Sequence, residues 1–123
     1  MSIYKQREIV LVPFPFSDLS GKKVRPVLVL SNNDYNRKSS DILVCGLTTN
    51  LKKTPYSIAV SPDDVEIKGS LRHESKIKID AIASIEKKLL IKTIATLKLN
   101  VFEEVISEIN RLIKVKNQKR SIT

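Results

Sequence analysis

The chain has 123 residues, 41% of them hydrophobic and 28% charged, a composition that argues against a disordered segment and predicts one packed domain. Its single cysteine excludes an internal disulfide framework, its one histidine and one cysteine argue against a zinc site, and no apolar run approaches the ~20 residues needed to span a bilayer. Lysine and arginine outnumber acidic residues by 22 to 13, and the net charge of +9 favours a polyanionic partner, although such a surplus can also serve only to keep a protein dispersed.

The first part of the chain predicts two strands. Residues 1–7 lack the apolar stretch and the small-residue cleavage site of a signal peptide, and the single cysteine fits a reducing cytoplasm. Residues 8–12 are rich in β-branched side chains and predict a strand that ends or reaches a sheet edge near Pro13, because proline cannot donate to the ladder. After a basic loop over 17–23, residues 25–31 form a short continuous apolar run, which predicts a strand buried on both faces.

The middle of the chain alternates short strands with turns. Residues 31–36 carry turn chemistry with a short helical turn, and 41–48 predict a third strand that is apolar before a polar end. A basic loop over 52–55 leads to a short strand over 56–60, a helical turn over 62–64 and a turn at Gly69. Residues 76–85 alternate polar and apolar side chains, which predicts a strand with one wet face.

The end of the chain changes to a helical period. After a short helical connection over 86–90 and a last strand over 91–97, Asn100 and Glu103 have the spacing of a capping box that starts a helix. We therefore predict a single domain over 1–123 with a core over 8–114 and a basic tail over 115–123, folded as a small, partly closed β-barrel with one C-terminal helix. The predicted apolar face of the helix consists of Phe102, Val105, Ile106, Ile109, Leu112 and Ile113.

Arg25 is the first candidate for a functional residue. Pro26 holds it extended at the start of the most apolar strand, so its guanidinium is fixed at the rim of the core, where it can bind phosphate bidentately. Position alone leaves a second interpretation open, in which Arg25 forms a structural ion pair with a carboxylate such as Asp41.

Two further groups of polar residues lie on predicted strands. Residues 48–50 (TTN) end the third strand, where hydroxyls can donate to a phosphate oxygen or can simply form a turn. Lys78 and Asp80 are two residues apart and share one face, either as a phosphate-binding cation with a proton acceptor or as a solvated ion pair. His73 is expected to be a solvated loop residue and Cys45 an inert member of the core.

The order of these features resembles the PemK/MazF family, the toxin endoribonucleases of bacterial and archaeal toxin–antitoxin pairs. The matching stretches are 9–18 (IVLVPFPFSD), 25–32 (RPVLVLSN), 42–50 (ILVCGLTTN), 75–80 (SKIKID) and 84–87 (SIEK). The Arg-Pro strand with its preceding Phe-Pro-Phe segment is the most specific part. The resemblance implies an SH3-like barrel, a homodimer, and cleavage of single-stranded RNA without a metal or cofactor.

The resemblance also implies roles for particular residues. Arg25 and Thr48 match the family's central catalytic pair, and Asp80 matches an aspartate that some members use. We expect Arg25 to stabilise the phosphorane, Thr48 to donate to a non-bridging oxygen and Asp80 to accept the proton of the ribose hydroxyl, which gives a 2′,3′-cyclic phosphate. Further RNA-binding residues are expected at Ser17, Lys22, Lys23, Thr49, Asn50, Lys52, Lys53 and Lys78.

The chain departs from the family pattern at several positions. Lys78 stands where those members with the aspartate have an arginine, which keeps the charge and loses the fork of donors. Ala83 stands where many members carry another arginine, and Arg7 replaces a glycine that usually precedes the first strand. The loop over 17–23 contains no histidine, although some members have one there.

Partners follow from the same resemblance. It implies an antitoxin whose acidic, partly disordered tail occupies the RNA groove, and binding of operator DNA by the toxin–antitoxin complex. Two other classes stay open from the residues alone. A non-catalytic SH3-like module would bind nucleic acid in a salt-dependent way and release no product, and a protein-interaction module would use its groove for a partner peptide.

Overall fold

The computed structural model describes residues 4–14 and 23–116. Within these ranges the strands and helices follow the predicted order, with boundaries that differ by a few residues. The elements are β1 (Glu8–Phe14), β2 (Lys23–Val29), α1 (Asn33–Lys38), β3 (Asp41–Thr48), β4 (Ser57–Val60), η1 (Pro62–Asp64), β5 (Ser75–Glu86), η2 (Lys87–Leu89), β6 (Lys92–Thr96) and α2 (Leu99–Ile113).

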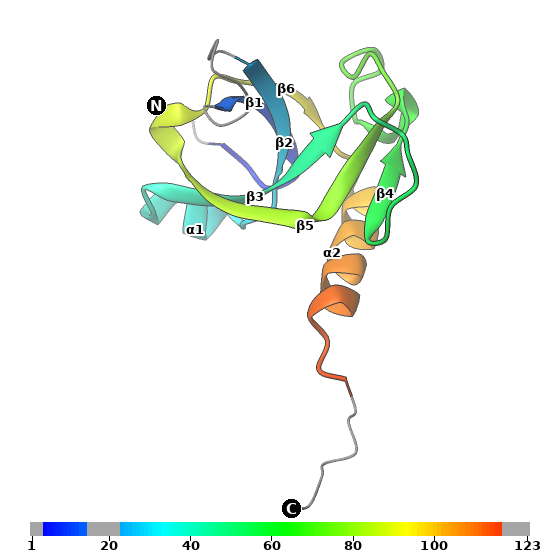
Figure 1. Ribbon diagram of the computed structural model, residues 1–123. Coiled ribbons are helices and arrows are strands. Elements are labelled where there is room, and N and C mark those ends of the chain that lie inside the picture. The colour runs from blue at the N-terminus through cyan, green and yellow to red at the C-terminus, as the bar shows by residue number, and fades with distance from the viewer. Residues whose placement is uncertain (1–3, 15–22, 117–123) are drawn as a thin grey trace, which may run out of the picture.

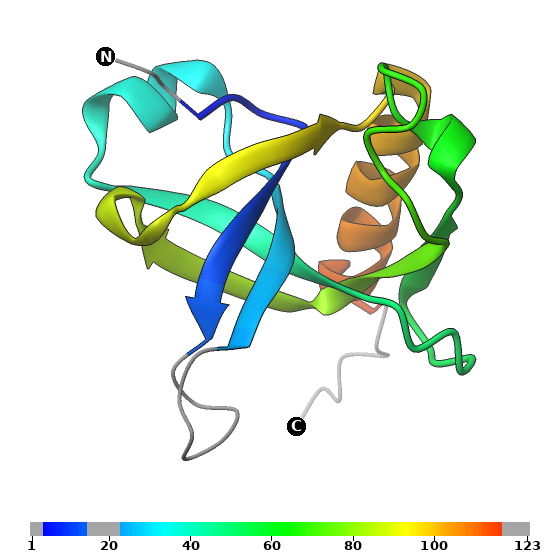
Figure 2. The same cartoon turned by 90° about the horizontal axis from the view of Figure 1, so that it is seen from above.

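The six described strands form one antiparallel sheet in the order β4-β5-β3-β2-β1-β6. The sheet curls strongly, as Figures 1 and 2 show. Its two edges are joined where Val65, after η1, bridges Leu97, after β6, and where the backbone N–H of Glu66 donates to the carbonyl of Thr96 at 2.8 Å. The expected small, partly closed barrel with one C-terminal helix is therefore confirmed.

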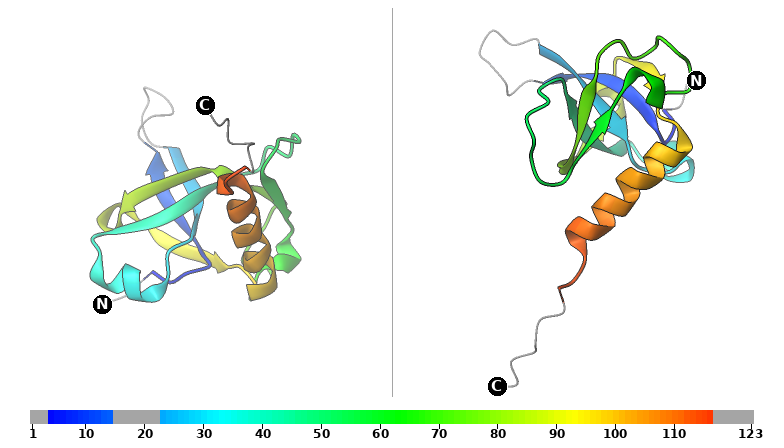
Figure 3. Two further views of the ribbon diagram at one scale, coloured as in Figure 1. Left: turned by 90° about the horizontal axis from the view of Figure 1, so that it is seen from below. Right: turned by 90° about the vertical axis from the view of Figure 1, so that its right-hand side faces the viewer.

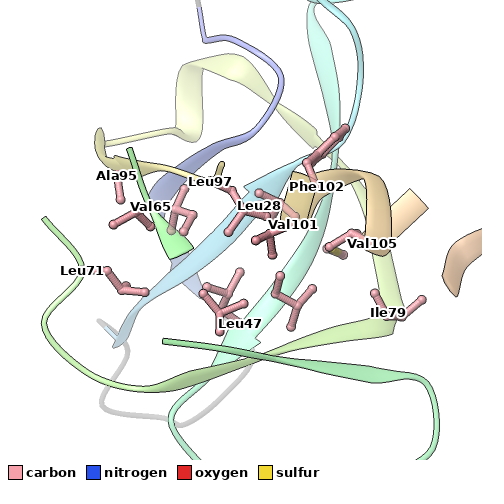
Figure 4. Close-up of a cluster of buried hydrophobic side chains, with 14 residues drawn as sticks. Leu28, Leu47, Val65, Leu71, Ile79, Ala95, Leu97, Val101, Phe102 and Val105 are labelled. Atoms are coloured by element: carbon pink, nitrogen blue, oxygen red, sulfur yellow. The ribbon is translucent and has the colours of Figure 1, made fainter. Parts of the chain in front are cut away.

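The second strand, β2, is buried on both faces, as its continuous apolar run predicts. Val27, Leu28 and Val29 are at most 2% exposed. Leu28 belongs to a cluster that also contains Phe102 and Val105 of α2 (Figure 4), whereas Val27 and Val29 belong to a second cluster on the other side of the sheet. We call these two sides the helix face and the opposite face.

Pro13 lies at a sheet edge, in agreement with the prediction. β1 pairs with β6 only as far as Leu11, while its pairing with β2 continues through Pro13 to Phe14. Beyond Leu11, the side of β1 that faces away from β2 has no strand partner among the described residues, so the missing N–H of the proline breaks no ladder bond there.

The start of α2 differs from the prediction. The N-cap is Lys98 and the helix begins at Leu99, so Asn100 already lies in the first turn and caps nothing. The backbone decides this, because the N–H of Lys98 donates to the carbonyl of Asp64 and the N–H of Phe102 donates to the carbonyl of Lys98, both at 2.9 Å. A tertiary contact thus sets a boundary that the capping pattern placed two residues too late.

The apolar face of α2 is confirmed in its first part and wrong at its end. Phe102 and Val105 are buried, and Ile106, Ile109 and Leu112 pack partly against the same cluster. Ile113 is 68% exposed, because the end of α2 extends away from the sheet, as Figure 3 shows.

The regular alternation predicted for β5 is interrupted. Lys78 pairs with Gly46 of β3, but the next β3 residue, Cys45, pairs with Ile82, so residues 79–81 form a bulge without β3 partners. The bulge exchanges the faces on which the two halves of β5 present their side chains. After the bulge, Ile82 lies on the helix face, where it is 41% exposed. Lys76, which lies before the bulge and was predicted to be wet, is 7% exposed because its ammonium bonds to the carbonyl of Lys52 and to Thr54 Oγ1.

Candidate functional site

Arg25 and Thr48 occupy equivalent positions on β2 and β3. The last cross-strand pair at this end is Val27 with Gly46, and the two candidates lie two residues farther along each strand. Successive side chains of a strand alternate between faces, so Arg25 and Thr48 both lie on the opposite face, with Val27 and Gly46. On β2, Pro26 lies between Arg25 and Val27, and it has no backbone N–H that could continue the hydrogen-bond ladder towards Arg25.

Two lysines of β5 continue this arrangement. Thr48 pairs with Lys76, and Gly46 pairs with Lys78, so both lysines belong to the same face as Arg25. We call Arg25, Thr48, Lys76 and Lys78 the cationic row. Gly46 lies inside it without a side chain, and among the described residues a Cβ built there would meet the Cβ of Ala81, at the ordinary contact distance of 3.7 Å. The surface of the row is therefore low at its centre.

The register excludes the alternative in which Arg25 pairs with Asp41. Asp41 begins β3, seven residues before Thr48, which corresponds to about 24 Å along the strand. Its carboxylate instead accepts a hydrogen bond from Ser84 Oγ at 3.3 Å. Arg25 and Asp41 stand at opposite ends of the sheet.

Thr48 is oriented by the loop that it begins. Its Oγ1 accepts the backbone N–H of Asn50 at 3.1 Å, and the side-chain oxygen of Asn50 accepts the N–H of Lys52 at 3.1 Å. The threonine hydroxyl still carries its own proton, so it can donate to an anion on the surface of the row. The polar residues at this strand end thus form the turn and leave a donor available, which combines both interpretations from the sequence.

Lys76 is a site residue that sequence reasoning missed. Its ammonium donates to the carbonyl of Lys52 and, at 3.1 Å, to Thr54 Oγ1, which ties the β3–β4 loop to β5. The other end of the loop is fixed at Tyr56, whose ring lies under the guanidinium of Arg111 at 4.4 Å. The only signal in the sequence was a second lysine two residues before Lys78, which by itself is typical of a wet strand.

Asp80 does not lie in a regular, paired part of β5, as the predicted alternation implied. Lys78 and Asp80 are both exposed and flank the fully buried Ile79, as predicted. Asp80 lies inside the bulge, however, so no β3 residue fixes its direction. The backbone is held instead by the N–H of Ile79, which donates to the carbonyl of Tyr56 at 3.0 Å.

The remaining predicted RNA-binding residues are exposed where the structure describes them. Lys23 begins β2 two residues before Arg25, on the same face. Thr49, Asn50, Lys52 and Lys53 lie in the exposed β3–β4 loop, which Figure 2 shows on the same edge of the molecule as the start of β2. Ser17 and Lys22 lie outside the described residues.

Two cavities border this end of the sheet. One of about 520 Å³ is lined by the loop residues Leu51 and Lys53 and by Lys76, and also by the carboxylates of Asp64 and Glu74. A second, of about 580 Å³, lies on the helix-face side and includes Pro26 and Thr49 in its wall. Neither lining includes Arg25 or Thr48.

Two residues set aside from the sequence take the expected places. Cys45 is fully buried, and burial raises the pKa of its thiol to about 12, so it is an inert core residue. His73 is exposed in the segment after Gly69. No group of three or more histidine, cysteine, aspartate or glutamate residues in the described part of the chain could hold a metal ion, and none of the described helices is long and apolar enough to cross a membrane.

Comparison with known proteins shows which family the chain is similar to. The model of the PemK-like, MazF-like toxins of type II toxin–antitoxin systems matches residues 5–113. The chain belongs to this family. No curated protein sequence matches it.

Solved structures of PemK/MazF-like proteins share the fold. A MazE–MazF complex from Deinococcus radiodurans matches with a TM-score of 0.75 at 19% identity, over 94% of this chain and 100% of that chain. A mycobacterial endoribonuclease in complex with its cognate antitoxin gives 0.72 at 20% identity, over 92% and 97%. The Mycobacterium tuberculosis toxin MazF-mt6 gives 0.71 at 18% identity, over 89% and 99%.

One departure from the PemK/MazF pattern has a clear structural effect. Arg7, at the place where the family usually has glycine, has a φ of 79° in the left-handed region that favours glycine. Its guanidinium donates to the carbonyl of Leu97 and pairs with Glu66, both at 3.0 Å, which offsets part of the strain. Arg7 therefore adopts a conformation that suits glycine, with side-chain contacts that hold it there.

Proposed function

We propose that the chain is a toxin endoribonuclease that cleaves single-stranded RNA without a metal ion. The observation that carries the proposal is that Arg25 and Thr48 lie at the same height on neighbouring strands and on the same face of the sheet. The protein that carries them has a net charge of +9. Membership of the PemK/MazF-like toxin family supports it, as does the description of structural relatives as endoribonucleases.

In the proposed reaction the ribose 2′-oxygen attacks the adjacent phosphorus, and the bond from phosphorus to the 5′-oxygen breaks. Asp80 accepts the proton of the attacking hydroxyl, and the leaving 5′-oxygen takes up a proton. Arg25 stabilises the negative charge of the phosphorane, Thr48 donates to a non-bridging oxygen, and Lys78 holds a phosphate. The products are a 2′,3′-cyclic phosphate and a 5′-hydroxyl.

Arg25 fits an electrostatic role better than a proton-transfer role. A guanidinium keeps its proton at neutral pH, so it is a poor general acid, whereas its planar donors match two phosphate oxygens. A fixed donor aimed at developing charge is worth about 10²–10³ in rate. We therefore assign the protonation of the leaving 5′-oxygen to a group other than Arg25.

The proposal includes partners. An antitoxin with an acidic tail would cover the cationic row, and the complex would bind operator DNA in the cytoplasm. Relatives described as complexes with a cognate antitoxin support the first point. A homodimer is supported by exposed apolar side chains on the helix face, where Leu43 and Ile82 are 40% and 41% exposed and lie on diagonal positions of β3 and β5.

A non-catalytic nucleic-acid-binding module is the second candidate. Two observations favour it. Lys78 and Ala83 stand at positions where many family members have an arginine with its forked donors, and Asp80 lies in a bulge. It predicts RNA affinity that falls steeply with salt and no cleaved product.

Induced expression tests the proposal in the cell. Wild type and Arg25→Ala are expressed in a bacterial host, growth is followed, and the 5′ ends of cellular RNA are mapped. We expect wild type to stop growth and to create new 5′-hydroxyl ends, and Arg25→Ala to do neither. Growth arrest by both proteins without new ends would favour the binding module.

A further inference from the structure

The cavity of about 580 Å³ is the open end of the barrel interior. It lies between β1, β2 and β6 on one side and the segment around Arg72 on the other. Leu71, which is 7% exposed and belongs to the main core, forms part of its floor, and Figure 4 places this residue at the end of the cluster near Ala95 and Val65. Its size is in the range of ~300–1,000 Å³ that is usual for small-molecule sites.

The lining combines basic, hydroxyl and apolar groups. Arg72, His73 and Lys92 are exposed around it, and no acidic residue is among the described residues that line it. Such a set attracts an anion and offers it several donors. The other lining residues are the hydroxyl-bearing Thr49, Ser70, Ser75 and Thr93, the apolar Leu11, Pro26, Leu71 and Ile94, and Gly69.

The cavity and the cationic row use the same two strand ends. Pro26 follows Arg25 and Thr49 follows Thr48, and the members of each pair belong to different sides of the sheet. A polymer that crosses this rim can therefore place one unit on the cationic row and a neighbouring unit in the cavity.

We propose that the cavity binds a nucleotide of the RNA strand that flanks the scissile phosphate. This inference rests on the proposed function, since the strand must first lie on the cationic row. Arg72 and Lys92 bind the flanking phosphate, the apolar wall of Leu11 and Pro26 contacts the face of the base, and the hydroxyls meet its polar edge. An acidic peptide would satisfy the cations and leave this mixed wall without a matching group, so the chemistry favours RNA.

His73 gives a direct probe of occupancy, because it is the only histidine in the chain. Its imidazole signals are followed by NMR while a short mixed-sequence RNA with 2′-O-methyl riboses is added. This RNA has no free 2′-hydroxyl and is not cleaved, so the experiment does not depend on catalysis. We expect the His73 signals to shift in a saturable way, and an unchanged signal at saturating RNA would overturn the proposal.

A matched pair of double variants locates the contact. Arg72→Ala with Lys92→Ala removes two charges from the cavity, and Lys38→Ala with Lys114→Ala removes two exposed charges elsewhere. For the cavity variant we expect affinity for the same RNA to fall about tenfold and the salt slope of binding to drop by about 0.7, the value for one lost phosphate contact on a single strand. Equal losses in both variants would contradict a specific site.

Two further arms separate the possible sources of failure. If a poly-glutamate peptide shifts the His73 signals and the RNA does not, the cavity binds acidic peptides and the RNA assignment is wrong. Cleavage of unmodified RNA is measured in parallel with wild type. A chain that binds RNA at His73 and cleaves nothing would refute the proposed function and leave the binding site intact.

Discussion

Thr48 and Lys76 form a cross-strand pair in which the threonine begins the β3–β4 loop and the lysine holds that loop in place. A buried ammonium bonded to loop oxygens is unusual on a strand face, because lysine is rarely buried unless its donors are satisfied. The pair explains how a loop of exposed residues keeps a fixed geometry beside Arg25.

Lys76→Met tests this relationship. Methionine keeps the length and the apolar part of lysine and removes the donors to Lys52 O and Thr54 Oγ1. We expect the free energy of unfolding to change by less than about 1 kcal/mol, because the loop acceptors can turn to water. RNA cleavage should fall about tenfold, because Thr48 loses its fixed position. Lys38→Met on α1 is the control, and equal cleavage by wild type and Lys76→Met would refute the positioning role.

Lys78→Arg restores the forked donors of the family pattern. A bidentate guanidinium binds phosphate more strongly than an ammonium, so we expect RNA cleavage to rise by about fivefold, equivalent to about 1 kcal/mol. Lys78→Gln, which removes the charge, should lower it. Both rates are compared under identical salt. If arginine and glutamine have the same effect, Lys78 does not touch the substrate.

Arg7 provides a test of backbone strain. Arg7→Ala and Arg7→Gly both remove the contacts to Leu97 and Glu66, and they differ only in how well they tolerate a φ of 79°. We expect the glycine variant to be more stable than the alanine variant by about 1 kcal/mol. Urea unfolding of the two proteins measures the difference. An alanine variant as stable as the glycine variant would show that this residue is not held in the left-handed region.

Cys45 should resist thiol reagents in the folded protein. Its pKa is raised by burial from the ordinary 9.0 to about 12, so the native thiol stays protonated and covered. Labelling at mildly alkaline pH should occur only after denaturant is added. By linkage, the native state binds this proton more tightly, so Cys45 favours folding below pH 9.0 and this contribution is lost as the pH rises from 9.0 towards 12. Rapid labelling of native protein would contradict the burial.

Much of the fold followed from short-range patterns. The apolar run around Leu28 and the β-branched run of β1 fixed the central strands, because burial on both faces leaves few alternatives. The placement of Arg25 and Thr48 near each other on neighbouring strands was expected only through the family resemblance, since no local pattern specifies which strands are neighbours.

The features that the sequence did not reveal depend on tertiary contacts. The start of α2 is set by Lys98 and Asp64, which are distant along the chain. The bulge over residues 79–81 contains no glycine or proline that would signal it in the sequence, and it decides the surroundings of Asp80. The burial of Lys76 depends on its bonds to the β3–β4 loop, which the sequence does not show either. Local propensity cannot report a register shift that is decided by the packing of neighbouring strands.

Cleavage of a mixed-sequence RNA in the presence of EDTA tests the central claim most directly. Purified wild type and Arg25→Ala are compared, and the new ends are identified chemically. We predict that wild type produces 2′,3′-cyclic phosphates in EDTA and that Arg25→Ala is slower by about 10²–10³. Cleavage by Arg25→Ala at the rate of wild type, or a wild type that cleaves only when a divalent metal is added back, would contradict the account.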